Sequence, residues 1–173
     1  MPAMTLPGCG PRGQITPDTD ELPKFTVTRR VSFRPPEIFA VVSDVGSYNE
    51  FLPLVERSTV RNRKPIVNDV ENFSADIVVG YKKMGIQESF ISQVESSATS
   101  LTVTAVSFGN AVKKLSSSWQ ITPVDEKRSD ITFAVDYEMK SAMLQMVLGS
   151  MFERVAERIM NAFEARAATL YRS

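Results

Sequence analysis

The chain has 173 residues, of which 43% are hydrophobic, and its 20 basic and 20 acidic side chains cancel. This length predicts one domain around one core, and the balanced charge provides no overall field that would attract nucleic acid or an anionic membrane. The sequence contains no histidine and a single cysteine, Cys9. This composition excludes Ser-His-Asp and Cys-His triads, the common zinc sites and an internal disulfide, so we expect no metal site.

The first part of the chain is rich in proline and glycine, which predicts a disordered leader over residues 1–23 and a folded domain over 24–173. The leader lacks the apolar core of a signal peptide, and its acidic residues argue against a mitochondrial presequence. No run of about twenty apolar residues is present to span a bilayer. We expect a protein of the bacterial cytoplasm, peripheral to the inner membrane, or one on the matrix side of the mitochondrial inner membrane if its source is eukaryotic.

The folded region opens with a predicted strand over residues 24–33, where apolar and polar residues alternate. Pro35 and Pro36 favour the first turn of a helix, whose apolar stripe ends near Gly46. Residues 48–54 predict one further helical turn, closed by a proline that cannot donate a backbone hydrogen bond. Two short helices should therefore follow the first strand.

Six strands are predicted between residues 55 and 139, separated by short polar or glycine-containing turns. The clearest covers residues 131–139, where alternate apolar residues share one face: Ile131, Phe133, Val135, Tyr137 and Met139. The preceding strand places four residues on one face in the same way: Leu115, Ser117, Trp119 and Ile121. Short connections between consecutive strands favour an antiparallel meander.

The chain closes with a predicted helix over residues 141–171. Steps of 100° place one apolar stripe along it: Leu148, Phe152, Val155, Ile159, Phe163, Ala167 and Leu170. Together these elements predict an α+β fold in which a curved seven-stranded antiparallel sheet wraps around the long C-terminal helix. Strong curvature can hold part of such a sheet away from a straight helix and leave a cavity.

Three segments now read together as a known pattern: VSFRPPEIFAVVSDVGSYNEFLPL, DIVVGYKKMGIQESFISQV and SMFERVAERIMNAFEARAATLY. Their most specific elements are Val-x-x-Tyr-x-x-Phe-Leu-Pro, which begins at Val45, and the Phe-Glu-Arg helix that ends in Leu170-Tyr171. Over residues 24–171 the chain resembles the coenzyme Q-binding branch of the START-like, or polyketide cyclase-like (SRPBCC), superfamily. The resemblance implies the START-like helix-grip fold.

The same resemblance implies a non-catalytic carrier or chaperone that binds ubiquinone (coenzyme Q) between the sheet and the C-terminal helix and supports respiratory electron transport. Bacterial members of this branch are described as ribosome-association toxins, so the large ribosomal subunit is an alternative partner. The chain departs from the family in two places. The usual Trp-Cys after Pro53 is Leu54-Val55 here, and the usual Asp-Gly-Pro-Phe turn is replaced by residues 108–111.

A ligand site is expected where aromatic residues of the helix-to-strand loop meet the inner face of the sheet. Ser92, Ser117 and, if no β-bulge reverses the register, Glu88 also face inward, where a packed core would not favour polar groups. The structural alternative is that the aromatic residues only fill the core. The predicted ligand-binding residues are Phe39, Tyr48, Phe51, Leu52, Pro53, Leu54, Tyr81, Glu88, Phe90, Ser117, Trp119, Phe133, Tyr137, Leu148, Phe152 and Val155.

The first turns of the C-terminal helix carry apolar residues almost all the way round, so one face cannot bury them all. This methionine-rich end predicts a portal, a membrane-touching edge or a homodimer contact, and burial under neighbouring loops is the alternative. Its predicted portal residues are Met143, Leu144, Met146, Val147 and Met151.

Two other functions stay open at this point. Basic clusters that include Arg61 and Lys64 could contact ribosomal RNA through phosphates, although no aromatic residues are interleaved with them. A cyclase or hydrolase of the same fold would need a polar constellation, for which only Tyr81, Glu88 and Tyr137 offer themselves. We therefore expect a binding protein with no catalytic residues and no required cofactor, whose ligand is ubiquinone or another lipid.

Overall fold

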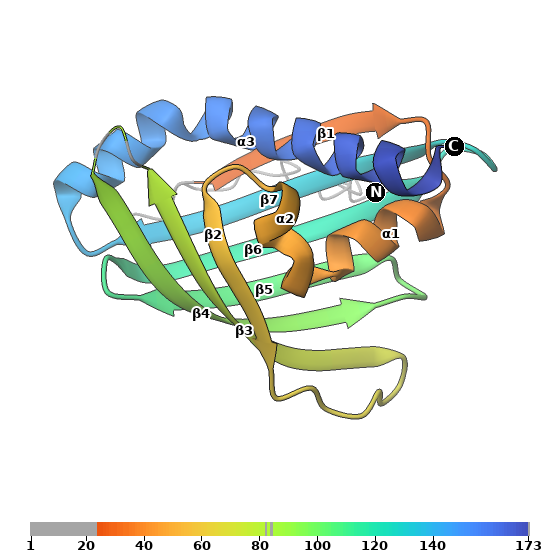
Figure 1. Ribbon diagram of the computed structural model, residues 1–173, viewed down its shortest axis with the longest axis horizontal. Coiled ribbons are helices and arrows are strands. Elements are labelled where there is room, and N and C mark those ends of the chain that lie inside the picture. Colours follow the sequence, from red (N-terminus) through yellow and green to blue (C-terminus); the bar gives the residue numbers. More distant parts are fainter. Residues whose placement is uncertain (1–23, 82, 84, 173) are drawn as a thin grey trace, which may run out of the picture.

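The computed structural model describes residues 24–81, 83 and 85–172 and shows one antiparallel sheet with its helices on one face (Figure 1). The expected leader and Cys9 lie outside the described residues. The strands are β1 (Lys24–Val31), β2 (Val55–Arg61), β3 (Val70–Tyr81), β4 (Ile86–Ser97), β5 (Thr102–Gly109), β6 (Val112–Pro123) and β7 (Ser129–Met139). Their order is β1-β7-β6-β5-β4-β3-β2, which confirms the predicted seven-stranded antiparallel sheet.

Four helical segments cover the inner face: α1 (Pro35–Ser43), the 3-10 turn η1 (Val45–Ser47), α2 (Tyr48–Phe51) and α3 (Ala142–Tyr171). The side chain of Glu37 accepts a hydrogen bond from the backbone N–H of Arg34 at 2.9 Å and so closes the first turn of α1. Figure 1 shows α3 running over β1 and β7, with α1 and α2 beside its C-terminal half. α3 therefore packs on the β1–β7 edge, whereas α1 contacts β5 and β6, and η1 and α2 contact β2.

The strand register decides which side chains face the helices. β3 and β4 pair without interruption from Val70 opposite Ser97 to Tyr81 opposite Ile86. Register shifts occur only beside Glu56 in β2 and Lys113 in β6. Consequently the predicted inner faces of β6 and β7 are confirmed, and Glu88 and Ser117 do point toward the helix layer.

The buried stripe of α3 differs in part from the predicted one. Phe152, Phe163 and Ala167 are buried as expected, but Ala156 and Met160 replace the half-buried Val155 and Ile159 as its central residues, and Leu170 is 52% exposed. Both alternatives are apolar, so helical periodicity alone could not choose between them. The choice follows from packing on β1 and β7, where the small side chain of Ala156 permits close approach.

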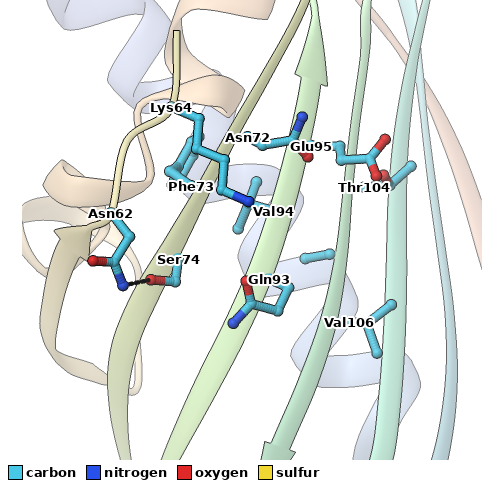
Figure 2. A pocket seen from close by; sticks show the side chains of 11 residues that line it. Asn62, Lys64, Asn72, Phe73, Ser74, Gln93, Val94, Glu95, Thr104 and Val106 are labelled. Carbon is cyan, nitrogen blue, oxygen red and sulfur yellow. Dashed lines mark hydrogen bonds between the residues drawn. The ribbon is translucent and has the colours of Figure 1, made fainter.

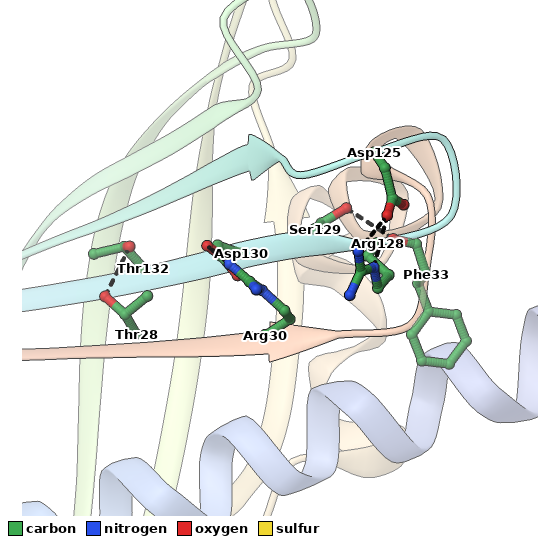
Figure 3. A network of polar contacts seen from close by, with 8 residues as sticks. All are labelled: Thr28, Arg30, Phe33, Asp125, Arg128, Ser129, Asp130 and Thr132. Atoms are coloured by element: carbon green, nitrogen blue, oxygen red, sulfur yellow. Dashed lines mark hydrogen bonds and ion pairs between the residues drawn. The ribbon is translucent and has the colours of Figure 1, made fainter.

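Polar contacts fix the β1–β7 edge of the sheet (Figure 3). The hydroxyl of Ser129, which is fully buried, donates a 2.8 Å hydrogen bond to the carbonyl of Phe33 and so ties the chain after β1 to the start of β7. On the outer face Arg30 donates to both carboxylate oxygens of Asp130, at 2.8 and 3.1 Å, and these bonds lower the pKa of that carboxyl. These contacts set the register of the edge strand that α3 covers.

The packing of α3 leads to a stability prediction. Phe163→Ala should lower the free energy of unfolding by about 3–5 kcal/mol, because it removes a buried ring that contacts both α2 and the sheet. Leu170→Ala, on the same predicted stripe but exposed, should change it by no more than about 0.5 kcal/mol. Chemical denaturation followed by circular dichroism measures both values. Equal losses in the two variants would contradict this packing.

Candidate functional site

A cavity of about 150 Å³ lies between the inner face of the sheet and the η1–α2 segment. An apolar cavity of roughly this volume holds a single small aromatic ring. No side chain that lines it carries a charge, and most are apolar. The lining residues are Val45, Tyr48, Ile77, Phe90, Ser92, Val94, Val103, Ala105, Ser107, Leu115, Ser117 and Trp119.

The cavity exists because the sheet carries small side chains where α2 covers it. Ser92, Ser107 and Ala105 lie on adjacent positions of β4 and β5, and Ser117 follows on β6. The roof above them is held in place from two sides. Tyr48 donates its hydroxyl to the carbonyl of Val42, and Ser58 donates to the carbonyl of Val45 at 2.6 Å. These two bonds fix the start of η1 and the start of α2 and so hold the roof above the sheet.

Burial at this position affects the chemistry of Tyr48. Desolvation, with a smaller contribution from the charge of Asp44, raises the pKa of the phenol well above its usual value. The hydroxyl therefore stays protonated and remains bonded to the Val42 carbonyl. Tyr48 presents an aromatic ring to the cavity rather than an acid or a base.

Aromatic rings form the back wall of the cavity. Trp119 stacks on Phe133 with ring centroids 4.4 Å apart and meets Phe163 of α3 edge-on at 4.7 Å. Phe163 also contacts the rings of Tyr48 and Phe51, at 5.4 and 5.3 Å. No residue of α3 lines the cavity itself. The expected cavity beneath the C-terminal helix is thus found beside it, and α3 supports its wall from behind.

Polar groups in the cavity are almost all hydroxyls. The side chains of Ser92 and Ser107 lie opposite each other on β4 and β5 and share a hydrogen bond of 2.7 Å. They are only 2% and 4% exposed. Ser117 is the third hydroxyl of the lining. An uncharged, hydroxyl-bearing cavity suits a neutral molecule better than an ion.

Four of the predicted ligand-binding residues line this cavity: Tyr48, Phe90, Ser117 and Trp119. Several others lie just behind it. Phe51, Leu52, Phe133 and Tyr137 pack in the core around the wall. Pro53 and Leu54 form a half-buried turn, in which Leu54 adopts a φ of 74°, a left-handed conformation that is unusual for leucine.

The remaining predicted residues are not brought into the cavity. Phe39 lines a groove of about 270 Å³ next to α1. Phe152 lines another groove, of about 480 Å³, between β1 and α3. Tyr81 and Glu88 lie half-buried near the tip of the β3–β4 hairpin. Two half-buried residues of α3 complete the set: Leu148 and Val155.

The methionine-rich end of α3, residues 143–151, lies at the end of the sheet where β5 turns into β6 and β7 ends. Inner positions of β4 lead from Val94 through Phe90 to that end, and the backbone N–H of Lys140 donates to the carbonyl of Ala111 there, at 3.0 Å. Met143 and Met146 are 67% and 70% exposed. The other three predicted portal residues are half-buried: Leu144, Val147 and Met151.

Sequence reasoning missed one whole wall of the cavity, which is formed by β5. Val103, Ala105 and Ser107 face inward, but Val106 and Phe108 on the opposite face are also apolar. Alternation therefore gave no clear inner face for this strand. The signal that could have found Ser107 is its expected pairing with Ser92 in an antiparallel meander.

A groove of about 400 Å³, larger than the cavity, lies on the outer face of β3, β4 and β5, opposite the helices (Figure 2). Its lining is polar, and Asn62 donates a 3.1 Å hydrogen bond to Ser74 across one side of it. Lys64 and Glu95 also line this groove. It was not predicted, because outward polar residues of a sheet usually indicate only solvent exposure.

Within residues 24–81, 83 and 85–172, no group of three or more His, Cys, Asp and Glu side chains is arranged to hold a metal ion. In the same part of the chain, no helix is both long enough and apolar enough to cross a membrane.

Known proteins share both the sequence pattern and the fold. Coenzyme Q-binding protein COQ10, mitochondrial, from Drosophila melanogaster is 30% identical over 142 residues, which cover 80% of this chain and 56% of that protein. The chain thus matches little more than half the length of this relative. Ribosome association toxin RatA from Escherichia coli (strain K12) is 26% identical over 151 residues, which cover 87% of this chain and 90% of that protein.

Two solved structures show the same fold. An 18 kDa protein from Caulobacter crescentus has a TM-score of 0.74 at 24% identity and covers 88% of this chain and 100% of its own. Zhui aromatase/cyclase from Streptomyces has a TM-score of 0.75 at 15% identity, with coverage of 88% and 98%. Residues 31–164 match the family described as polyketide cyclase / dehydrase and lipid transport. The chain belongs to this family, and its fold is the START-like helix-grip.

Proposed function

We propose that this protein is a non-catalytic carrier that binds the ring of a polyprenyl quinone, ubiquinone, in the cavity beneath η1–α2. The observation that carries the proposal is the cavity itself: it is ring-sized, free of charged side chains and walled by Tyr48, Phe90 and Trp119. Ubiquinone has a neutral quinone ring and a long apolar tail. The name of the Drosophila relative, a coenzyme Q-binding protein, supports the same ligand.

The tail must leave the cavity, because drug-sized ligands already need roughly 300–1,000 Å³. The inner face of β4 leads from Phe90 toward the methionine-rich end of α3. We place the tail along this path, past the half-buried side chain of Leu148. Each buried methylene contributes about 0.8 kcal/mol, so the tail supplies most of the affinity and the cavity positions the ring.

Lack of catalysis follows from the positions of the titratable groups. Tyr81, Glu88 and Tyr137, the candidates for acid-base chemistry, do not line the cavity. Tyr48 does line it, but its hydroxyl is bonded to a backbone carbonyl and its pKa is raised. A bound ring would therefore meet no acid or base within hydrogen-bonding distance, which general acid-base catalysis requires.

The ribosome-associated relative makes the large ribosomal subunit the alternative partner. Recognition of the ribosomal RNA through its charge would need basic side chains that are not paired with acidic ones. In the basic clusters, Arg61 pairs with Asp76 and Arg63 with Glu71, while Arg30 pairs with Asp130. Most of these arginines are therefore neutralised by acidic neighbours, and this arrangement favours the carrier function.

The tail-length dependence tests the carrier proposal. Trp119 is the only tryptophan of the chain and lines the cavity, so quenching of its emission reports binding of a quinone ring. Among quinones with no, one, two or three isoprene units, the dissociation constant should fall by at least about tenfold per added unit while the tail is being buried. An affinity that is independent of the tail would contradict the proposal.

Membrane delivery gives a second test. We propose that Met143 and Met146 insert into the lipid surface at which the quinone is exchanged, with a homodimer contact as the other use of this apolar end. Changing both to Asp should weaken binding to vesicles of phosphatidylcholine and phosphatidylglycerol by about tenfold or more. Sedimentation of the protein with the vesicles measures this effect.

The matched control for that experiment is Ile66→Asp with Val67→Asp. These residues are as exposed as the two methionines, but they lie in the loop between β2 and β3, far from the start of α3 (Figure 1). The control should leave vesicle binding unchanged. Equal losses in both double variants would show that exposed apolar residues promote vesicle binding wherever they lie. That result would contradict this part of the proposal.

A further inference from the structure

The donors that face the cavity outnumber the acceptors they can reach. Ser92 and Ser107 share one hydrogen bond of 2.7 Å, in which one hydroxyl donates and the other accepts. Whichever serine donates, the hydroxyl of the accepting serine still has its own hydrogen to donate. No second hydrogen bond from either hydroxyl is found among the described residues, so one donor remains available inside a pair that is 2% and 4% exposed.

Trp119 adds a donor of a different kind. Its indole N–H can donate but cannot accept a hydrogen bond. The side chain is 7% exposed, lines the cavity and makes no hydrogen bond to another described residue. Among the described residues, every fully buried polar atom of a side chain has a hydrogen-bond partner. Because the indole nitrogen has no partner, it is not fully buried. The N–H is therefore accessible, and Trp119 is among the residues that line the cavity.

The geometry places these donors in one row. Ser92 and Ser107 are direct cross-strand partners, and Ser117 lies on β6 opposite Ala105, one inner-facing position along β5 from Ser107. Trp119 is the next inner-facing residue after Ser117. Ala105, the cross-strand partner of Ser117, also lines the cavity and has only a methyl group.

We propose that this row, centred on the Ser92–Ser107 pair, selects the headgroup of the ligand and accepts only an uncharged ring that carries carbonyl-type oxygens. The proposal rests on the carrier function and specifies which residues recognise the ring. A carboxylate or phosphate would lose its hydration without meeting a cation, because no charged side chain lines the cavity. A hydrocarbon would leave the donors without acceptors.

Recognition of the ring is therefore separate from affinity for the tail. Fatty acids and lysophospholipids have tails that could follow the same path, but their charged headgroups are excluded. Alkylbenzenes match the ring in size, but they offer no oxygen to Ser92, Ser107 or Trp119. A quinone satisfies both requirements, because its two carbonyl oxygens accept hydrogen bonds without carrying charge.

The test compares two ligands that differ only in oxygen, decyl-benzoquinone and decylbenzene, through the emission of Trp119. In Ser92→Ala/Ser107→Ala, binding of the quinone should weaken by about tenfold, the effect of one lost hydrogen bond, while binding of decylbenzene should stay the same or improve. The single variant Ser117→Ala keeps the buried pair and should weaken quinone binding alone by a few-fold. Decanoate should bind to none of these proteins.

The matched control is Ser116→Ala, which removes a hydroxyl from the opposite face of the same strand, β6. It should leave both affinities unchanged. Headgroup selection is overturned if the double variant binds quinone as the wild type does, or if it loses quinone and decylbenzene equally, since the latter would indicate a collapsed cavity. Failure of the wild type to bind either ligand would overturn the carrier function together with this inference.

Discussion

The contact on which the rest of the structure depends is the ring of Phe163 wedged between α2 and the sheet. It meets Tyr48, Phe51 and Trp119 at centroid distances of 4.7–5.4 Å and so joins the long helix, the short helix and the central strands in one aromatic cluster. Burial of such rings supplies a large share of core stability. Phe163 contacts α2 on one side and the Tyr48–Val42 bond holds it on the other, and the cavity lies between this single helical turn and the sheet.

This arrangement divides the inner face into two functional halves. The half formed by β1, β7 and part of β6 carries Phe25, Phe133 and Tyr137 and packs against α3, with the groove lined by Phe152 at its β1 edge. The half formed by β4 and β5 carries serine and alanine, and space remains above it. Zhui aromatase/cyclase has the same fold. In this chain, no charged side chain lines the cavity. The polar side-chain groups of its lining are hydroxyls and one indole N–H, and this is why we propose a binding rather than a catalytic role.

Much of the fold could be predicted because several signals agreed. Strand 131–139 alternates strictly, and the short turns between strands allow only an antiparallel meander. Predictions failed where apolar residues occupy more than one face. On α3, Val155 and Ala156 are both apolar, and only contact with β1 decides which is buried. On β5, Val106 and Phe108 concealed the inward row that contains Ser107. The place of the cavity depends on how far α2 stands from the sheet, which no local pattern encodes.

We propose that the cavity beneath α2 holds an isoprenoid quinone. Organic extraction of the purified protein, followed by mass spectrometry, tests it most directly when wild type is compared with Ala105→Phe, a change that fills the cavity from its floor. Circular dichroism verifies that both proteins are folded. The account predicts a polyprenyl quinone in the wild-type extract and its loss from the variant. No quinone in the wild type, or the same amount in both proteins, would contradict it.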